Sequence, residues 1–414
     1  MLLKFRFNNF GPFLDDASFS MIASGGKIKQ RYPNNYLSSA GVDVLKTSVI
    51  VGENAGGKTN FMQALDYLRS FLFKNTDKPV LPAVNTVFFG NQAGSDNPSS
   101  PEMKQEFELE VIASDNCIYS YKLVIDRFGI VEENLFWREA YKRKPIPSFE
   151  LKRDEVEELG EGKKQLSYSI SVNSNASIQS LFENQASLEN GLMANKLSLL
   201  GVEHVTPFVN WINDTLNVRC ARIPLDILYS FRYRDSDMTS LQEILRSDEF
   251  FDIFRLVDSS IIQIEVSDEQ PFEKTLVVRD CGKGRYSIAL ENDSAGVQQF
   301  FALSLEVYKV IKEHKVVFAD ELDSTLNPIL TGKIINYINS FPDCGQFIFT
   351  THNVTHLNLQ TFMREQMYVV SKCKDTLESC IHCLSEYKEL RYDSNNKIYE
   401  YYFKGLLGGV DNGQ

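Results

Sequence analysis

One short motif limits what this chain can fold into more than any other feature. Residues 52–59 read Gly-Glu-Asn-Ala-Gly-Gly-Lys-Thr and fit the pattern G-x-x-x-x-G-K-[ST] at every fixed position. The apolar run Ser48–Val51 precedes the motif, and apolar residues recur at helical spacing from Phe61 to Leu72 after it. A buried strand, a glycine-rich turn and a helix in this order are typical of a phosphate-binding loop. The pattern predicts an α/β protein with a nucleotide-binding sheet flanked by helices.

The phosphate-binding loop assigns a role to each kind of residue in it. Glycines let backbone N–H groups turn toward the phosphates, and the N-terminus of the helix adds positive potential. We expect Lys58 to reach the β- and γ-phosphates and the Thr59 hydroxyl to bind magnesium. A glycine-rich turn without a ligand is the alternative, which the flanking strand and helix disfavour. The residues expected to surround ATP are Gly52, Glu53, Asn54, Ala55, Gly56, Gly57, Lys58, Thr59 and Asn60.

A second apolar strand ends in two acids. The run Val316–Ala319 is followed directly by Asp320 and Glu321. Asp320 is expected to hold magnesium directly or through water, and Glu321 to polarise the attacking water as a general base. Taken alone, acids after a strand can equally cap the next helix. The phosphate loop in the same chain favours the catalytic interpretation.

Two further segments lie at positions where such a site needs polar groups. Ser294 and Gly296 open a predicted helix, although Ser294 could serve as an N-cap alone. His352 follows the short buried strand Phe347–Phe349. A lone histidine at a strand end is usually structural, but this one lies where a sensor of the γ-phosphate would be needed. The function of both segments depends on the context that the rest of the chain supplies.

The four motifs, in this order, resemble the Walker A, signature, Walker B and switch-histidine motifs of ATP-binding-cassette (ABC) ATPases. The resemblance implies that two copies sandwich two ATP molecules and hydrolyse them to ADP and phosphate. Ser294 and Gly296 would then act on the nucleotide of the other copy. The resemblance also gives Gln92 as a candidate glutamine-loop residue for nucleotide and magnesium, and residues 323–327 as the loop that crosses to the second copy. The residues that would act within one copy are Lys58, Thr59, Asp320, Glu321 and His352.

The separation of these motifs favours one group of relatives. The insertion between Gly52 and Ser294 is longer than in a transporter subunit, and it lacks the heptads of a long coiled coil. The chain therefore resembles the RecF and OLD-like group, in particular the stand-alone AAA ATPases of bacterial anti-phage and abortive-infection operons. Phe10–Phe13 resembles the adenine-side edge of that group, and Phe403–Val410 its glycine-rich tail.

The same resemblance shapes what we expect of partners. The segment after His352 is too short for the Toprim nuclease domain of OLD proteins, so a separate nuclease or toxin would be the effector. A DNA repair or recombination ATPase that clamps duplex DNA is the second hypothesis. A sensor or scaffold that binds ATP tightly and seldom hydrolyses it is the third.

Composition bounds these hypotheses. The 43 Lys and Arg residues face 55 Asp and Glu residues, and the net charge of −12 disfavours coating of nucleic acid by bulk charge. The seven scattered cysteines indicate reduced thiols. The sequence shows neither a signal peptide nor a run of 18 apolar residues, so we expect a cytoplasmic protein without a membrane segment.

The organisation expected from the chain is one sheet assembled from both ends. Residues 1–125 and 285–414 would form the ATPase domain, and residues 126–284 an inserted β-rich and helical subdomain for a lid or dimerisation. A charged hairpin or loop is expected at 150–166, helices over much of 178–258, and strands near 261–266, 275–278 and 286–290. The cysteines near His382 are interpreted as part of a strand instead of a zinc site, because a second ligand pair is lacking. The basic run 141–144 could contact nucleic acid, but beside Pro145 and Pro147 it is interpreted as a solvated hairpin.

Overall fold

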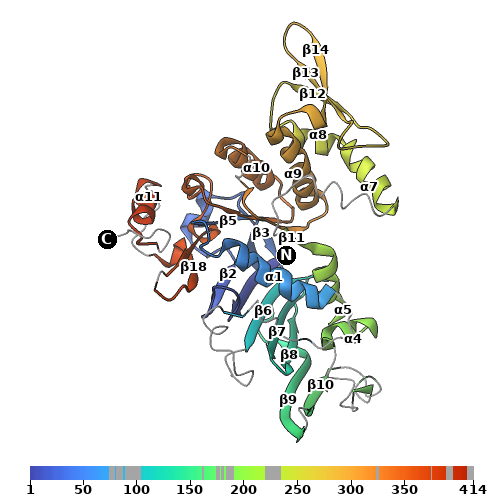
Figure 1. Ribbon diagram of the computed structural model, residues 1–414, viewed down its shortest axis with the longest axis vertical. Coiled ribbons are helices and arrows are strands. Elements are labelled where there is room, and N and C mark those ends of the chain that lie inside the picture. Colours follow the sequence, from blue (N-terminus) through green and yellow to red (C-terminus); the bar gives the residue numbers. More distant parts are fainter. Residues whose placement is uncertain are drawn as a thin grey trace.

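The computed structural model shows an elongated molecule with a parallel sheet at its centre (Figure 1). The structure describes residues 1–73, 80, 87–88, 104–160, 163–173, 178, 181–182, 191–219, 235–322, 326–373, 375–387 and 395–407.

The central sheet has six strands in the order β11-β15-β16-β5-β17-β18. The first five are parallel to their neighbours, and β18 pairs antiparallel with β17. The predicted strands before the phosphate loop, before the two acids and before His352 are all confirmed. The six strands are β5 (Thr47–Gly52), β11 (Leu216–Arg219), β15 (Val316–Ala319), β16 (Gln346–Thr351), β17 (Met367–Lys372) and β18 (Ser379–Cys383).

Both faces of this sheet are covered, which explains its continuous apolar runs. All six residues of β5 are buried. Ile50 packs into the core that contains α1 (Lys58–Phe73), whereas Val49 and Val51 pack into the core of α9 (Ala295–Lys312) and α10 (Pro328–Ser340). Helices therefore flank both faces of the sheet, as the sequence predicted.

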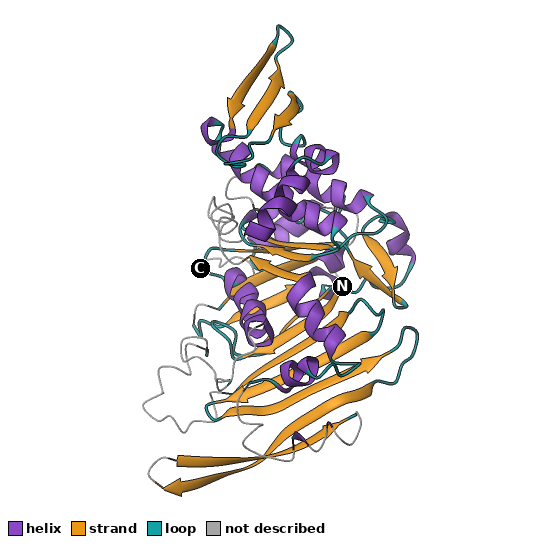
Figure 2. Ribbon diagram, turned by 90° about the vertical axis from the view of Figure 1, so that its right-hand side faces the viewer, coloured by secondary structure: helices purple, strands orange, loops and turns teal. Residues whose placement is uncertain are grey.

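A second sheet lies below the first in Figure 2. The prediction that the nucleotide-binding sheet is assembled from both ends of the chain is confirmed, because β5 pairs with β16 and β17. The N-terminal strands β1 and β2 do not join that sheet and form part of this separate layer. Half-buried alternation, as in β6 with its buried Phe107, Leu109 and Val111, identifies a strand but does not reveal its sheet. The antiparallel order is β10-β9-β8-β7-β6-β1-β2. Its strands are β1 (Leu2–Asn8), β2 (Ala17–Ser20), β6 (Gln105–Ile112), β7 (Ile118–Asp126), β8 (Gly129–Arg138), β9 (Ile146–Gly160) and β10 (Lys163–Val172).

The predicted insertion is divided among three places. The seven-stranded sheet continues past residue 126 into β8, β9 and β10, where β9 and β10 form the hairpin expected at 150–166. Strand β11 belongs to the central sheet, beside β15, and so lies within the nucleotide-binding layer. Between them come the short helices α4 (Met193–Leu199) and α5 (Thr206–Asn210) and the π-helix η5 (Trp211–Thr215). Phe208 and Trp211 are buried in the core.

Residues 235–293 form what we call the outer lobe, at the top of Figure 1. Its three strands confirm the prediction for residues 261–290. They form the antiparallel sheet β12-β13-β14. The elements of the lobe are α7 (Asp235–Leu245), α8 (Asp248–Phe254), β12 (Ile261–Glu265), β13 (Leu276–Asp280), β14 (Arg285–Ala289) and the 3-10 turn η7 (Leu290–Asn292).

The remaining elements are short. They are the 3-10 turns η1 (Lys27–Arg31), η9 (Val354–His356), η10 (Arg364–Gln366) and η11 (Leu384–Glu386), the hairpin of β3 (Tyr36–Ser39) and β4 (Val42–Leu45), and α11 (Asn395–Phe403). None of the described helices is long and apolar enough to cross a membrane. Within the same residues, no group of three or more His, Cys, Asp or Glu side chains is placed to share a metal ion.

Candidate functional site

The phosphate loop follows β5, and close packing around it explains two of its glycines. A Cβ atom at Gly52 would lie 2.4 Å from the backbone oxygen of Val370 on β17. Gly57 has a φ of +112°, and a Cβ atom there would lie 2.9 Å from Ser379 Oγ on β18. Only glycine suits the second position, because its backbone conformation strains any residue with a side chain. Strands β17 and β18 therefore set the shape of the loop.

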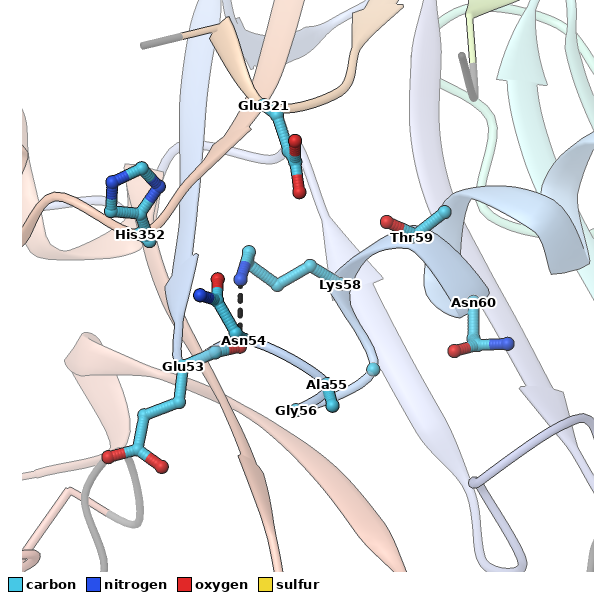
Figure 3. A pocket seen from close by; sticks show the side chains of 10 residues that line it. Glu53, Asn54, Ala55, Gly56, Lys58, Thr59, Asn60, Glu321 and His352 are labelled. Carbon is cyan, nitrogen blue, oxygen red and sulfur yellow. Dashed lines mark hydrogen bonds between the residues drawn. The ribbon is translucent and has the colours of Figure 1, made fainter. Parts of the chain in front are cut away.

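Lys58 begins α1, and its side chain lies along the loop. Its Nζ donates hydrogen bonds to the backbone oxygens of Gly52 at 2.7 Å and Glu53 at 2.9 Å. The second of these bonds is the dashed line in Figure 3. The side chain is buried. The loop thus holds a buried cation on its inner side, where the charge of a phosphate would be placed.

Thr59 and Asp320 meet although 261 residues separate them in sequence. The Thr59 hydroxyl donates to Asp320 Oδ2 at 2.7 Å. The other carboxylate oxygen of Asp320 accepts a hydrogen bond from the hydroxyl of Thr350 on β16. A hydroxyl and a carboxylate at this distance offer the hard oxygen ligands that Mg²⁺ prefers, so these residues fit a magnesium ion. The chain would supply only these two, and phosphate and water oxygens would complete its coordination.

Glu321 and His352 face the loop from the ends of neighbouring parallel strands (Figure 3). Glu321 has a φ of +46°, a conformation that non-glycine residues rarely adopt and that often marks a functional position. Its backbone N–H donates to Thr350 Oγ1 at 2.8 Å, which fixes the turn. A cavity of about 430 Å³ lies between these side chains and the loop. Its lining residues are Glu53, Asn54, Ala55, Gly56, Gly57, Lys58, Thr59, Asn60, Glu321 and His352.

The predicted signature residues lie elsewhere in the chain's structure. Ser294 is exposed and caps α9, accepting a hydrogen bond from the backbone N–H of Val297 at 3.4 Å. Ser294 and Gly296 are not among the described residues that line the cavity. The N-cap interpretation of Ser294 is therefore confirmed, and its exposure leaves it accessible to a second molecule. Gln92 and residues 323–325 of the predicted crossing loop lie outside the described residues.

Sequence reasoning missed two supports of the site. Thr350 binds both Asp320 and Glu321, and only its place at a strand end could have suggested this. Ser379 on β18 donates from Oγ to the Gly56 oxygen at 2.7 Å, and its N–H donates to the Pro12 oxygen at 2.7 Å. The second bond brings the Phe10–Phe13 turn against the phosphate loop. No pattern near Ser379 indicated that contact.

The C-terminal helix also approaches the loop. Burial, followed by the nearby charge of Glu53, raises the pKa of Tyr402 on α11 to about 12. Phe403–Leu407 is the described part of the predicted glycine-rich tail, and Leu407 is buried in the core of α9 and α10. Residues 408–410 lie outside the described residues.

A parallel sheet with a phosphate loop after β5 and paired acids after β15 defines a P-loop protein of the ABC ATPase type. Comparison of the sequence with protein families names the group more narrowly. The family described as "AAA domain, putative AbiEii toxin, Type IV TA system" matches residues 48–358, and the chain belongs to it.

Individual relatives share less. The "Chromosome partition protein Smc" of Chlorobaculum tepidum is 32% identical over 106 residues, which are 25% of this chain and 9% of that protein. An "SMC head domain from Thermotoga maritima" aligns over 92% of this chain and 98% of its own, with 14% identity and a TM-score of 0.45. A structure of "the SmcHead bound to the C-winged helix domain of ScpA" aligns over 93% and 99%, with 13% identity and a TM-score of 0.46.

Proposed function

We propose that this chain is an ATP-hydrolysing switch in which two copies close on two ATP molecules. One observation carries the proposal. The cavity brings together Lys58, Thr59, Glu321 and His352, whereas Ser294 lies exposed at the start of α9 and is not among the residues lining it. Among the described residues, a single copy thus brings together the predicted groups except the signature turn, and a second copy would supply that turn.

The residues suggest a division of labour. Mg²⁺, when bound between Thr59 and Asp320, would neutralise charge on the phosphates. Lys58 exchanges its bonds to the loop oxygens for the β- and γ-phosphate oxygens of ATP. Glu321 accepts the proton of the attacking water, and His352 contacts the γ-phosphate. The N–H groups at the start of α9, with Ser294, would face the same phosphate from the second copy.

Steady-state ATP turnover tests the proposed chemistry. Lys58→Ala removes the cation from the loop, so we expect turnover to fall by about 100-fold or more and ATP binding to weaken. Glu321→Gln keeps the geometry but loses the base, so it should bind ATP and stall before hydrolysis. Size-exclusion chromatography with light scattering should show Glu321→Gln as a dimer with ATP and as a monomer without it.

Lys333→Ala, at an exposed position on α10, is the matched control and should behave as wild type. Unchanged turnover in Lys58→Ala would contradict the proposed site. A Glu321→Gln protein that stays monomeric with bound ATP would contradict the sandwich.

The biological role that we propose is control of a separate nuclease or toxin in a bacterial anti-phage system. The description of the chain's family, which names a putative AbiEii toxin and a type IV TA system, supports this role. We expect the wild-type protein to form a complex with the product of a neighbouring gene and to release or activate it when ATP is added. Co-expression of the two proteins, followed by light scattering and an activity assay of the neighbour, tests the role.

A DNA repair or recombination ATPase is the second candidate, supported by the segment shared with a chromosome partition protein. Duplex DNA would then bind in a salt-sensitive way and stimulate ATP turnover. Binding and stimulation without any effect on a neighbouring gene product would favour this candidate over the first.

A further inference from the structure

A buried ion pair links the three-stranded sheet of the outer lobe to Asp293, the last residue of the lobe, which directly precedes Ser294. Arg279 lies on β13, in the middle of the three-stranded sheet of the lobe, and its side chain is 7% exposed. Its Nη2 lies 2.7 Å from Oδ2 of Asp293, whose side chain is 9% exposed. Its Nε donates to Oδ2 of Asp258 at 3.2 Å. One guanidinium thus joins the loop before β12 to the residue that precedes the predicted signature serine.

Asp293 is in turn hydrogen-bonded to Ser294. Oδ1 of Asp293 accepts a hydrogen bond from the backbone N–H of Ser294 at 2.8 Å. Gln298, one turn into α9, donates from Nε2 to the backbone oxygens of Glu291 and Asp293, both at 2.9 Å. The turn is therefore held from the lobe by Arg279 and from the helix by Gln298.

The other contacts between the lobe and α9 hold the helix and not the turn. Phe301, two turns into α9, packs edge-on against Phe250 and Phe254 of α8, with ring centroids 5.1 Å apart in both pairs. These apolar contacts fix the lobe on the body of the molecule. Arg279 is thus the described side chain of the β12–β14 sheet that reaches Asp293 with a charge. Backbone N–H groups of Leu290 and Glu291 also hold the preceding residues to the segment before β13, so a movement of the sheet would be transmitted to Asp293.

We propose that Arg279 is a positioning residue that couples the outer lobe to ATP-driven closure. Through Asp293 it holds Ser294 and Gly296 in the geometry that caps the nucleotide of a second copy. A partner that shifts the lobe would thereby weaken or strengthen the closed dimer without touching the cavity. This inference rests on the proposed sandwich of two copies.

Sedimentation equilibrium with saturating ATP, in a Glu321→Gln background, measures the coupling. Arg279→Met leaves Asp293 buried without its cation, so we expect the dimer dissociation constant to rise about ten-fold or more. The affinity of one protomer for ATP, measured with a fluorescent analogue at low protein concentration, should stay within about two-fold, because the cavity is untouched. Arg279→Lys, which keeps the charge but not the two-armed geometry, should give an intermediate dissociation constant.

The controls separate coupling from folding. Arg246→Met removes an exposed ion pair with Asp268 in the same lobe and should leave the dimer unchanged. If Arg279→Met lowers the melting temperature strongly, Asp293→Asn decides. Its amide oxygen can still accept from the Ser294 N–H while the ion pair with Arg279 is lost, so coupling predicts that the dimer dissociation constant rises in this variant as well. Dimerisation that is equal in Arg279→Met and Arg246→Met would overturn the coupling. If neither Arg279→Met nor Ser294→Arg weakens the dimer, the proposed sandwich is contradicted. If Ser294→Arg blocks dimerisation and Arg279→Met does not, the sandwich stands and the coupling through Arg279 is contradicted.

Discussion

At the scale of single residues, the motifs predicted which side chains share the cavity but not what holds them. Lys58, Thr59 and Glu321 could be named because the spacing of their motifs is fixed by the phosphates they are suited to bind. Thr350 could not be named in this way. Its hydroxyl donates to Asp320 and accepts from the Glu321 N–H, and both residues follow a strand about 30 residues earlier in the chain. Contacts between strand ends depend on the order of strands in the sheet, which periodicity does not encode.

Thr350→Val gives the first prediction at this scale. The valine keeps the shape of the side chain but removes the hydroxyl that orients Asp320 and the turn at Glu321. We expect kcat for ATP to fall about 10- to 100-fold and KM to change less than three-fold, because Lys58 and the loop are unaffected. Steady-state kinetics over a range of magnesium concentrations measure both constants.

Ser304→Ala is the control, since it also removes one buried hydroxyl, which in α9 donates to the Phe300 oxygen at 2.7 Å. It should lower thermal stability slightly and leave kcat unchanged. Equal losses of kcat in the two variants would show that Thr350 contributes only to stability.

At the scale of elements, strands and helices were predictable and their assembly was not. The runs before the acids and before His352 are apolar without interruption, because both faces of the parallel sheet are covered. Strand β11 was missed, since four residues within a helical region carry too short a pattern to be distinguished. The existence of two sheets was also hidden, because pairing between distant segments leaves no local signal.

A buried carboxyl joins two of these elements and predicts a dependence of stability on pH. Glu133 on β8 accepts hydrogen bonds from the backbone N–H groups of Met193 and Ala194 at the start of α4 and from the Tyr121 hydroxyl. Complete burial outweighs these bonds and raises its pKa from 4.5 to about 7. Between pH 4.5 and about 7 the unfolded chain ionises at this residue while the folded chain keeps its proton. The free energy of unfolding therefore falls as the pH rises through this range.

Glu133→Gln removes this ionisation. Relative to wild type, we expect the free energy of unfolding of the variant to rise by roughly 3 kcal/mol from pH 4.5 to pH 7.5. Urea unfolding of both proteins at several pH values measures the difference between their free energies of unfolding. The ionisation of other groups affects both proteins alike and cancels in this difference. Glu132→Gln, at the preceding residue on the partly exposed face of β8, is the control for replacing a carboxylate by an amide on this strand. A pH-independent difference for Glu133→Gln would contradict the burial argument.

At the scale of the whole molecule, the outer lobe and the central sheet are joined at α9, whose first residues carry the predicted signature turn. The lobe projects away from the two sheets (Figure 1). A partner that binds the lobe and moves it would therefore also move the turn that carries Ser294. The described cavity and the exposed Ser294 belong to different parts of one copy. In such a switch, the two states differ in how closely the two copies approach each other. A partner would influence that approach by binding to the outer lobe.

The central claim is that Lys58 and Ser294 act on one nucleotide from different copies, and mixing two impaired variants tests it most directly. Lys58→Ala and Ser294→Ala, which removes the hydroxyl without adding bulk to the interface, should each hydrolyse ATP far more slowly than wild type. In an equimolar mixture, about half of the dimers would contain both variants, and one of their two sites would carry an intact Lys58 and an intact Ser294. We predict that the mixture recovers up to about a quarter of wild-type ATP turnover. Turnover that stays at the average of the two separate variants would contradict the account.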